Sequence, residues 1–311
     1  MIDVLTLTMN PALDVYTTIN RVEPGHKMRC ASAIKHPGGG GINVARVLHR
    51  LGTSCLAVYP AGGATGERHH RMLSAEKVRS HVVPIAEEMR ENFSVHEESS
   101  DEDYRFVLPG ARLTPTEYEA CLDYVAQQLP RQFLVISGGL APGVPDDFFA
   151  RIAQLAHAKN LRVVLDSNGP ALAAALQAGV YLFKPSLREL EQISGSPLPD
   201  TASILAAARQ LTQRQQAQVV AVSLGKEGAL LVTQDAAWRA QSVSVTVRST
   251  IGAGDSFTAG MVWALTQGQD LVQAFASAMA SAAAALLSDG TSLSQADDMR
   301  QLLPRVQVHA V

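Results

Sequence analysis

The sequence has few of the features that define disulfide-bonded, zinc-binding or nucleic-acid-binding proteins. Its 311 residues include three cysteines, Cys30, Cys55 and Cys121, and no Cys-x-x-Cys pair. This number and spacing fit neither a disulfide framework nor a zinc site, and they are typical of a reducing compartment. The formal net charge is -3 and no basic patch or tail is present, so we expect no nucleic-acid partner.

The sequence also lacks a recognisable secretion signal or membrane span. Residues 1–6 have neither the basic start nor the long apolar run of a signal peptide. The most apolar late stretch, residues 274–287, is mostly alanine and serine and is shorter than the roughly 20 residues that a span requires. It predicts a helix packed inside the fold. We therefore expect a cytoplasmic protein without a membrane partner.

Two common nucleotide-binding fingerprints are missing as well. Neither G-x-G-x-x-G nor G-x-x-x-x-G-K-[ST] occurs in the chain. A P-loop is therefore excluded, and a Rossmann-type oxidoreductase is strongly disfavoured. Hydrophobic residues make up 47% of the sequence and charged residues 18%, which predicts a globular protein with a sizeable core.

Short β-branched runs alternate with helical patterns in the second half of the chain. This alternation predicts an α/β fold with a central, mostly parallel sheet covered by helices on both faces. Such sheets bind ligands beyond the carboxyl ends of their strands, so the loops after the strands are the candidate sites. The expected strands are Leu134–Ile136, Val163–Leu165, Tyr181–Phe183 and Val219–Val222, and the expected helices are Asp146–Ala158, Pro170–Gly179, Leu187–Ile193 and Thr201–Gln215.

The first 110 residues follow a different pattern. Val4–Thr8 predicts a strand, and Gly41–Leu51 predicts a helix that begins after a glycine cluster. Two stretches, about 15–33 and 91–108, alternate apolar and polar residues as half-exposed antiparallel strands do. We place them in a small β-sheet lid beside the main sheet. Because such a sheet is marginally stable alone, it is expected to cover a ligand, to pair with another subunit, or both.

The sharpest local signal is Gly252-Ala253-Gly254-Asp255, which follows an expected strand at 242–247 and leads into an apolar helix. Small residues at a helix N-terminus allow backbone N–H groups to converge on an anion, and the helix dipole favours negative charge there. Asp255 could accept a proton from an attacking hydroxyl beside that anion site. The alternative is that Asp255 only caps the helix.

A glycine run, residues 38–41, precedes Asn43 and is the second signal. Consecutive glycines permit close approach of backbone to a ligand, although a flexible hinge is the alternative. Asn43 offers a donor and an acceptor for sugar hydroxyls. Asp14 follows the first expected strand and is placed to bind hydroxyls, unless it is only a turn residue. Lys27, Arg29 and Arg90 lie in or beside the small sheet and could bind a phosphate, although solvated surface charge is the more common role for each of them taken alone.

Two further loops suit a nucleotide. Ser223–Gly228 joins two apolar strands with two glycines, Gly225 and Gly228, which leave backbone room for a triphosphate. Lys184–Glu189 follows a strand and begins a helix. Glu189 could orient magnesium, which prefers few protein carboxylates, or it could be an ordinary first-turn glutamate.

Taken together, these segments resemble the ribokinase-like carbohydrate kinases of the PfkB family. The resemblance extends over essentially the whole chain, 1–311, as a single kinase domain with a three-layer α/β/α fold. Asn10–Asp14 and the glycine block resemble the phosphosugar branch of the family, and residues 61–67 and 104–110 resemble its 6-phosphofructokinase isozyme 2 type. The family uses ATP and Mg²⁺, and its lid commonly forms a dimer clasp, so a homodimer or larger homo-oligomer is expected.

The resemblance also implies roles for residues of this sequence. Asp255 would be the general base, and Gly252, Ala253 and Gly254 would form the anion hole. Asp14, Gly39 and Asn43 would hold the sugar, and Lys27 and Arg90 its phosphate. Lys184, Ser186, Ser223, Gly225 and Gly228 would border the nucleotide, and Glu189 would support magnesium.

Two positions depart from the family pattern. Ser186 stands where the family usually has asparagine, and Gly139 stands where the most similar isozymes have a second serine. Neither touches the proposed base. We therefore expect ATP-dependent phosphorylation of fructose 6-phosphate at its 1-hydroxyl. Tagatose 6-phosphate or fructose 1-phosphate are alternative acceptors, and a catalytically weak sugar-phosphate sensor is the rival from another class.

Overall fold

Ten strands form the central sheet of the computed structural model, which describes residues 2–311. The strands run parallel from β11 to β5, and the three strands at the other edge are antiparallel. Apart from the edge strand β5, the parallel strands are mostly buried on both faces, which explains why they are largely continuous apolar runs rather than alternating ones. Their spatial order is β14 (Val308–Ala310), β13 (Ala237–Ala240), β12 (Ala229–Val232), β11 (Ala217–Ser223), β10 (Val180–Phe183), β9 (Arg162–Asp166), β8 (Phe133–Ser137), β1 (Val4–Leu7), β4 (Cys55–Ala61) and β5 (Ser80–Pro84).

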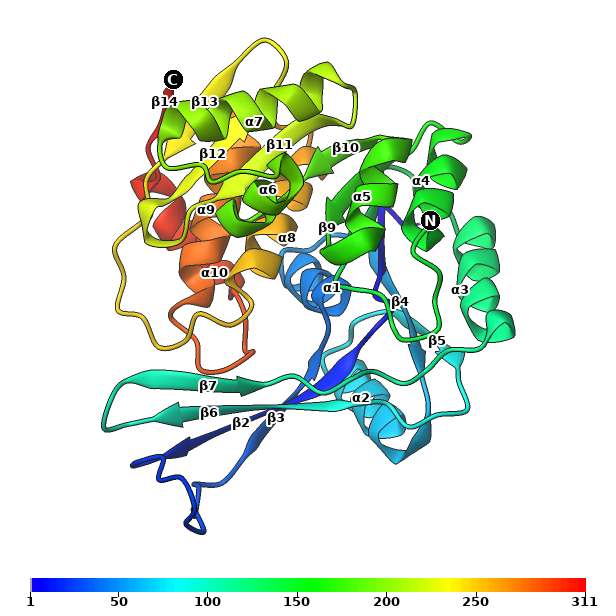
Figure 1. Ribbon diagram of the computed structural model, residues 1–311, viewed down its shortest axis with the longest axis vertical. Coiled ribbons are helices and arrows are strands. Elements are labelled where there is room, and N and C mark those ends of the chain that lie inside the picture. Colours follow the sequence, from blue (N-terminus) through cyan, green and yellow to red (C-terminus); the bar gives the residue numbers. More distant parts are fainter. Residues whose placement is uncertain (1) are drawn as a thin grey trace.

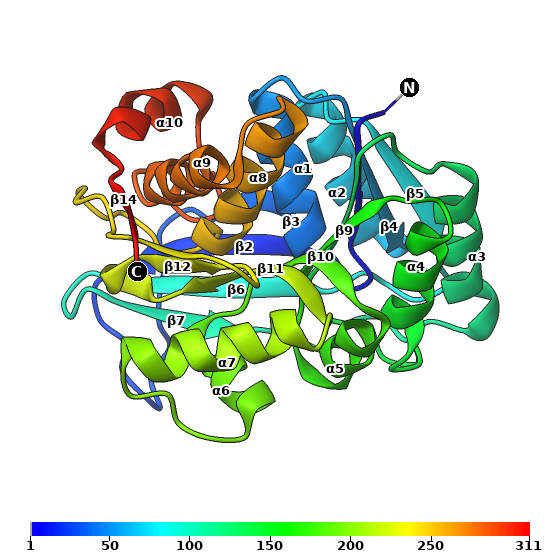
Figure 2. The ribbon, with the colours of Figure 1, turned by 90° about the horizontal axis from the view of Figure 1, so that it is seen from above.

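Helices cover both faces of this sheet and enclose two apolar cores (Figure 2). The expected three-layer α/β/α fold and its βαβ units are therefore confirmed. One face carries α1 (Gly40–Arg50), α2 (Gly63–Ala75), α8 (Ala253–Thr266), α9 (Leu271–Ala285) and α10 (Ala296–Leu302). The other carries α3 (Pro115–Gln127), α4 (Phe148–His157), α5 (Gly169–Ala178), α6 (Leu187–Ser194) and α7 (Thr201–Gln213), and two short 3₁₀ turns lie at Gly225–Glu227 and Leu303–Arg305.

The alanine-rich stretch at 274–287 is a helix packed inside the fold, as predicted. Most of it belongs to α9, whose small side chains allow close packing against α8. At the contact, a Cβ added to Gly260 would lie 2.6 Å from the backbone oxygen of Ser277. Among residues 2–311, no helix is both long enough and apolar enough to cross a membrane.

A second sheet of four strands extends away from the main body (Figure 1). Its order is β3 (Ile34–Gly38), β2 (Ala12–Ile19), β6 (Glu91–Glu97) and β7 (Glu102–Phe106). We call these four strands the lid. Its origin in two separate segments is confirmed, but two expectations about it are wrong.

The central pair of the lid, β2 and β6, is parallel rather than antiparallel. Both strands follow parallel strands of the main sheet, β1 and β5, so both leave its carboxyl edge in the same direction. Residues 21–33 form no strand, because Pro24 and Gly25 interrupt the alternating pattern, and the second strand lies later, at Ile34–Gly38. Only the outer pairs, β2 with β3 and β6 with β7, are antiparallel.

The strand expected at 242–247 is also absent. The segment is irregular and follows the short strand β13. Its alternating pattern arises because Val243 and Val245 pack on the same apolar core as α8 and α9, while Ser244 between them is exposed. The alternation of apolar and polar residues here therefore reflects burial of one side of an irregular segment that does not pair with a neighbouring strand.

Candidate active site

The carboxyl ends of four neighbouring strands bring polar groups together at one edge of the main sheet. Ser137 ends β8, Asp166 ends β9, Lys184 follows β10 and Ser223 ends β11. A cavity of about 280 Å³ opens at this edge, between the main sheet and the lid. It is lined by the glycine block before α1, by lid residues and by the start of α8.

The Gly-Ala-Gly-Asp segment forms the beginning of α8, as the sequence predicted. Gly252 is the N-cap residue with φ of +77°, a left-handed conformation that glycine adopts without strain. A side chain at this position would also collide with Leu293. Asp255 lies in the first helical turn, and its Oδ2 accepts a hydrogen bond of 2.8 Å from Asn43 Nδ2. The first N–H groups of a helix lack partners within it, so they are available to an anion.

The electrostatic surroundings of Asp255 favour a proton acceptor that works near neutral pH. Burial raises its pKa to about 7, and the nearby carboxylate of Asp166 adds to the increase. The hydrogen bond from Asn43 and the positive charge of Lys184 oppose it. A carboxyl group with such a pKa can take a proton at neutral pH and release it again.

Lys184 and Asp166 form a buried ion pair beside this carboxyl group. Lys184 is 6% exposed, and its Nζ lies 3.2 Å from Asp166 Oδ1. Thr258 Oγ1, from α8, donates to the other oxygen of Asp166. Burial raises the pKa of Asp166, whereas the attraction of Asp166 and Asp255 holds the pKa of Lys184 above its usual value. The lysine thus sits among carboxylates close to Gly254, where it offsets their mutual repulsion.

Asp166 was missed by the sequence analysis. The signal was present, because Asp166 comes directly after the apolar run Val163–Leu165 and so stands at the carboxyl end of a strand. The same reasoning had selected Asp14. Asp14 itself lies on the lid strand β2, rather than in a loop after β1.

Asp14, Gly39, Asn43 and Arg90 all line the 280 Å³ cavity, so the structure brings most predicted sugar-site residues together. Asp14 Oδ1 accepts a hydrogen bond of 3.1 Å from Asn92 Nδ2. Burial raises the pKa of Asp14. The hydrogen bond from Asn92 and the positive charges of nearby arginines, chiefly Arg105, lower it but do not cancel the increase. Asn92 and Arg105 line the same cavity and were not selected from the sequence, although both lie in the alternating stretch assigned to the lid.

The close approach expected of the glycine block is present. Gly39 has φ of +121°, and a Cβ there would lie 2.8 Å from the Thr8 side chain. At Gly38 a Cβ would collide with the carboxylate of Asp14. The glycines therefore let the chain pass close to the cavity floor, and the helix α1 that follows presents Asn43.

The two cations chosen for a phosphate occupy different places. Arg90 lines the cavity, and its guanidinium donates to the backbone oxygens of Asn10, Pro11 and Leu108. Lys27 lies exposed in the loop between β2 and β3 and is not part of the cavity wall of its own chain. Arg105 stands in the wall instead and adds a second cation to it.

A second cavity of about 470 Å³ lies on the other side of the Gly-Ala-Gly-Asp segment and is mostly apolar. Ser223, Gly225 and Gly228, the residues expected to border a nucleotide, line it. Ala253 and Gly254 line this cavity, while Gly252 and Asp255 line the first. The start of α8 is thus the wall between the two. The apolar lining of the second cavity comes mainly from Val243, Val245, Val247, Phe257, Met279, Ala283 and Leu286.

Ser186 and Glu189 form a capping box at the start of α6. Ser186 N and Oγ donate to Glu189 Oε2 at 2.8 and 2.9 Å, and Glu189 N donates back to Ser186 Oγ at 3.3 Å. The serine that departs from the family pattern therefore has a defined structural task. Glu189 is a first-turn glutamate, and it also lines the first cavity.

The acidic groups at this edge suit a metal that is shared with phosphate. Within residues 2–311, no three His, Cys, Asp or Glu side chains converge as a complete metal site. Mg²⁺ commonly takes one or two protein carboxylates and fills its remaining positions with phosphate oxygens and water. Asp166 and Glu189, which line the same cavity, fit that pattern.

Residues 2–298 match the profile described as pfkB family carbohydrate kinase. The match covers nearly the whole chain and includes both cavities and the wall between them. The chain belongs to the pfkB family of carbohydrate kinases. It is therefore a phosphotransferase that acts on an alcohol group, with the ribokinase-like fold.

Several relatives within this family are curated or solved. The chain is 42% identical to the ATP-dependent 6-phosphofructokinase isozyme 2 of Mycobacterium tuberculosis strain H37Rv, over 96% of this chain and 88% of that protein. Phosphofructokinase-2 of Escherichia coli, solved in complex with substrates and products, superposes with a TM-score of 0.94 at 37% identity, covering 98% of this chain and 99% of that one. A tetrameric inhibited form of the same Escherichia coli protein has a TM-score of 0.91 at 36% identity, with the same coverage. The 1-phosphofructokinase of Xanthomonas campestris is 34% identical over 84% of this chain and 83% of that protein.

Proposed function

We propose that this kinase transfers the γ-phosphoryl group of MgATP to the 1-hydroxyl of fructose 6-phosphate. The observation that carries the proposal is the position of the start of α8 between two cavities of opposite character, with Asp255 lining the polar one. One is polar and lined by Asp14 and Asn43, and the other is mostly apolar and bordered by the Ser223–Gly228 loop. An acceptor hydroxyl and a donor phosphate would thus meet at the start of α8.

The chemical steps assigned to the protein are few. Asp255 takes the proton of the sugar hydroxyl as that oxygen attacks phosphorus, and the proton stays on its carboxyl group until product leaves. The hydrogen bond from Asn43 holds the carboxylate toward the polar cavity. Most of the acceleration comes from positioning and from neutralising charge on the transferred group.

Backbone N–H groups at Gly252, Ala253 and Gly254 are assigned to the transferred phosphoryl. They belong to the N-cap and the first turn of α8, where the dipole also favours negative charge. Mg²⁺, held by phosphate oxygens with Asp166 and Glu189, would neutralise charge on the nucleotide phosphates. Lys184 and Ser186 would not bind the metal or the phosphates themselves. Lys184 would position Asp166 through their ion pair, and Ser186 would position Glu189 through the capping box.

Two observations lead us to propose fructose 6-phosphate rather than another acceptor: the names of the relatives and the cations in the cavity wall. The relatives with the higher identities are named 6-phosphofructokinase isozyme 2, while the 1-phosphofructokinase shares 34%. Arg90 and Arg105 supply two cations for a sugar phosphate at the lid side. Tagatose 6-phosphate and fructose 1-phosphate present the same groups in another arrangement and are the alternative acceptors.

The test is MgATP turnover with a panel of acceptors: fructose 6-phosphate, tagatose 6-phosphate, fructose 1-phosphate and free fructose. We expect the highest kcat/KM with fructose 6-phosphate. Free fructose should be at least about 100-fold worse, because it leaves charge-assisted hydrogen bonds to the arginines unmade. A higher kcat/KM with another phosphosugar would keep the mechanism and reassign the substrate.

A sugar-phosphate sensor would bind these compounds without turning them over. That reading depended on Ser186 and Gly139. The capping box gives Ser186 a structural task, and a Cβ added at Gly139 would meet Asn168 only at 3.4 Å, so the loop does not depend on glycine there. Saturable binding in calorimetry with no MgATP turnover would support the sensor and reject the kinase assignment.

We also propose that the protein works in the cytoplasm, where its three free cysteines would stay reduced.

We further propose that the protein forms a homodimer through the lid. Of the eight large apolar side chains that are exposed within residues 2–311, Ile34, Phe93 and Phe106 lie in the lid strands, and Met28, Val107 and Leu108 lie in the chain segments that adjoin them. Phe93 and Phe106 are directly paired, so they share a face of the lid. Asp14 and Asn92, paired one position along, point to the opposite face and toward the cavity. The apolar face is thus free for a second copy.

Phe106→Asp is expected to weaken the dimer at least about 30-fold, because it places a charge in the apolar centre of the contact. Phe106 is 56% exposed in the single chain, so the change should leave the fold intact. Sedimentation velocity over a dilution series measures the dissociation constant. Val311→Asp is the matched control, since Val311 is 50% exposed but lies at the C-terminus, outside the lid. Equal dissociation constants for both variants would rule out the lid as the interface.

A further inference from the structure

Arg46 is a fully buried cation in the middle of α1. It is 1% exposed and belongs to no cavity wall described above. Replacing a buried ion pair by apolar side chains is often neutral or even stabilising, so stability alone explains such a residue poorly. What only arginine offers is a planar fork of five N–H donors that can hold several acceptors at fixed angles.

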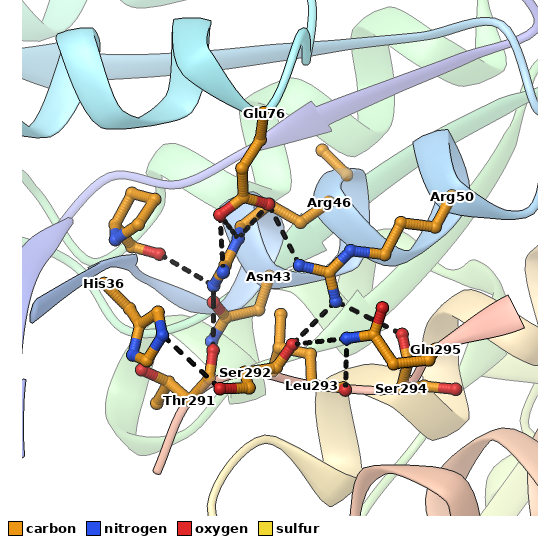
Figure 3. A network of polar contacts seen from close by, with 12 residues as sticks. His36, Asn43, Arg46, Arg50, Glu76, Thr291, Ser292, Leu293, Ser294 and Gln295 are labelled. Atoms are coloured by element: carbon orange, nitrogen blue, oxygen red, sulfur yellow. Dashed lines mark hydrogen bonds and ion pairs between the residues drawn. The ribbon is translucent and has the colours of Figure 1, made fainter. Parts of the chain in front are cut away.

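The donors of Arg46 connect four separate segments of the chain (Figure 3). On one side, Nε and Nη2 bind the carboxylate of Glu76, at the end of α2, at distances of 2.7 to 3.0 Å. On the other side, Nη1 donates to the backbone oxygens of Pro37 and Thr291 at 3.2 and 3.0 Å. Nη1 also lies 3.5 Å from Asn43 Oδ1, one helical turn earlier in α1.

The last of these contacts bears on the proposed base. A guanidinium can only donate, so the amide of Asn43 must turn its oxygen toward Arg46. Its nitrogen then faces Asp255 and donates to Oδ2 at 2.8 Å. A flipped amide would set two donors together at Arg46 and two acceptors together at Asp255. Arg46 therefore selects the amide orientation that stabilises the ionised form of Asp255.

The contact between Arg46 and Thr291 bears on the N-terminal turn of α8. Thr291 belongs to the loop 288–295, in which Leu293 has φ of +63° and lies against Gly252, where any Cβ would collide with it. Arg50, one turn after Arg46, supports this loop by donating to the oxygens of Ser292 and Ser294. The same loop thus backs the N-terminal turn of α8 and is tied to α1 by two arginines (Figure 3).

We propose that Arg46 is a positioning residue of this kinase. By orienting the amide of Asn43, it holds the Asp255 carboxylate ionised and aimed at the acceptor hydroxyl. The inference rests on the proposed function, in which Asp255 is the base. Arg46 itself touches neither the sugar cavity nor the nucleotide cavity.

The test compares Arg46→Lys with Arg50→Lys. Both changes remove a guanidinium that pairs with Glu76 and contacts the 291–294 loop, but only Arg46 contacts Asn43. We expect Arg46→Lys to lower kcat about 10- to 100-fold, with less than a threefold change in the KM of either substrate. The acidic limb of kcat against pH should move upward by about half a unit or more, since the ionised carboxylate loses an oriented donor. Arg50→Lys should keep the wild-type limb.

A second readout does not depend on turnover. Titration of the Asp255 carboxyl carbon by NMR, assigned through its loss in Asp255→Asn, should show a higher pKa in Arg46→Lys than in the wild type. In an Asn43→Ala background, Arg46→Lys should leave this pKa unchanged, because the intermediary is gone. Should Arg46→Lys not fold, Arg46→Met fills the same space, leaves Glu76 paired with Arg50, and is expected to give the same signature.

The outcomes distinguish failure of the proposed kinase function from failure of the role assigned to Arg46. A wild-type protein that phosphorylates no acceptor rejects the proposed function, and the NMR titration then still decides what Arg46 does to Asp255. A folded Arg46 variant with wild-type kcat and an unmoved Asp255 pKa overturns the inference and leaves the proposed function intact. Equal shifts in Arg46→Lys and Arg50→Lys also overturn it, since the effect would then be loss of packing.

Discussion

Asp255→Asn is expected to lower kcat at least about 100-fold while making the protein more stable at pH 8, by about 1–2 kcal/mol. The amide has the shape of the carboxylate but accepts no proton, so the reaction loses its base. It also carries no charge beside Asp166, whose repulsion adds to the raised pKa of Asp255. Steady-state kinetics and urea unfolding of the same preparations measure both effects.

The pH dependence gives the sign of each effect. The pKa of Asp255 is about 7 in the folded protein, above its ordinary value of 3.8, so the folded state binds more protons between these values. The wild type therefore loses stability as pH rises from about 4 to 7, and the loss should be smaller in the variant, which keeps only the other carboxyl groups with a raised pKa, Asp14 and Asp166. The kcat of the wild type should fall as pH drops below about 7, because the base becomes protonated.

Asp297→Asn is a suitable control, because the Asp297 side chain is 87% exposed and lies in α10. It should change neither kcat nor the pH dependence of unfolding. Near-normal kcat in Asp255→Asn would show that Asp255 is not the base and that the base lies elsewhere.

Lys184→Met is expected to reduce kcat at pH 7 about 100-fold and to destabilise the protein by about 2–4 kcal/mol at that pH. Removal of one partner leaves Asp166 buried without its cation, and leaves Asp255 facing a like charge. Both carboxyl groups should respond with higher pKa values. The acidic limb of kcat should therefore move to higher pH, beyond neutrality.

The stability loss in Lys184→Met should depend on pH in a defined direction. Below about pH 4 the carboxyl groups are protonated in the folded and unfolded states, so the loss should be smallest there. It should grow as pH rises, because the unfolded state then ionises Asp166 and Asp255 more readily than the folded state does. Lys159→Met, a change of an exposed lysine in the turn after α4, serves as the control. A destabilisation that is constant from pH 4 to 8 would mean that Lys184 contributes packing rather than charge.

The sequence predicted the core of the fold and the centre of the site for physical reasons that can be named. Parallel strands buried on both faces leave continuous apolar runs, so β8 to β11 were found within a residue or two. Glycines at close approaches are likewise visible, because few other residues tolerate the conformation of Gly39 and Gly252. The family resemblance assigned Asn43 and Asp255 to one active site, and the structure joins them by a hydrogen bond that no sequence pattern predicted.

What the sequence did not reveal depends on tertiary packing. Arg105 and Asn92 lie in a stretch whose alternation is clear, but alternation does not say which face meets the cavity. Lys27 was chosen by charge, and only the course of the β2–β3 loop shows that it lies outside the cavity of its own chain. The parallel pairing of β2 with β6 joins segments more than 70 residues apart, and no local pattern encodes it.

Neighbouring residues of β6 serve opposite faces of the lid, since Asn92 contacts Asp14 in the cavity while Phe93 lies on the exposed apolar side. One residue inserted or deleted within the paired part of β6 would exchange these faces beyond that point, placing an apolar side chain in the cavity or a polar one on the apolar side. Among natural variants, β6 should therefore keep its length. The hairpin turn after Glu97, beyond the last paired residues, is where length can vary without altering either face.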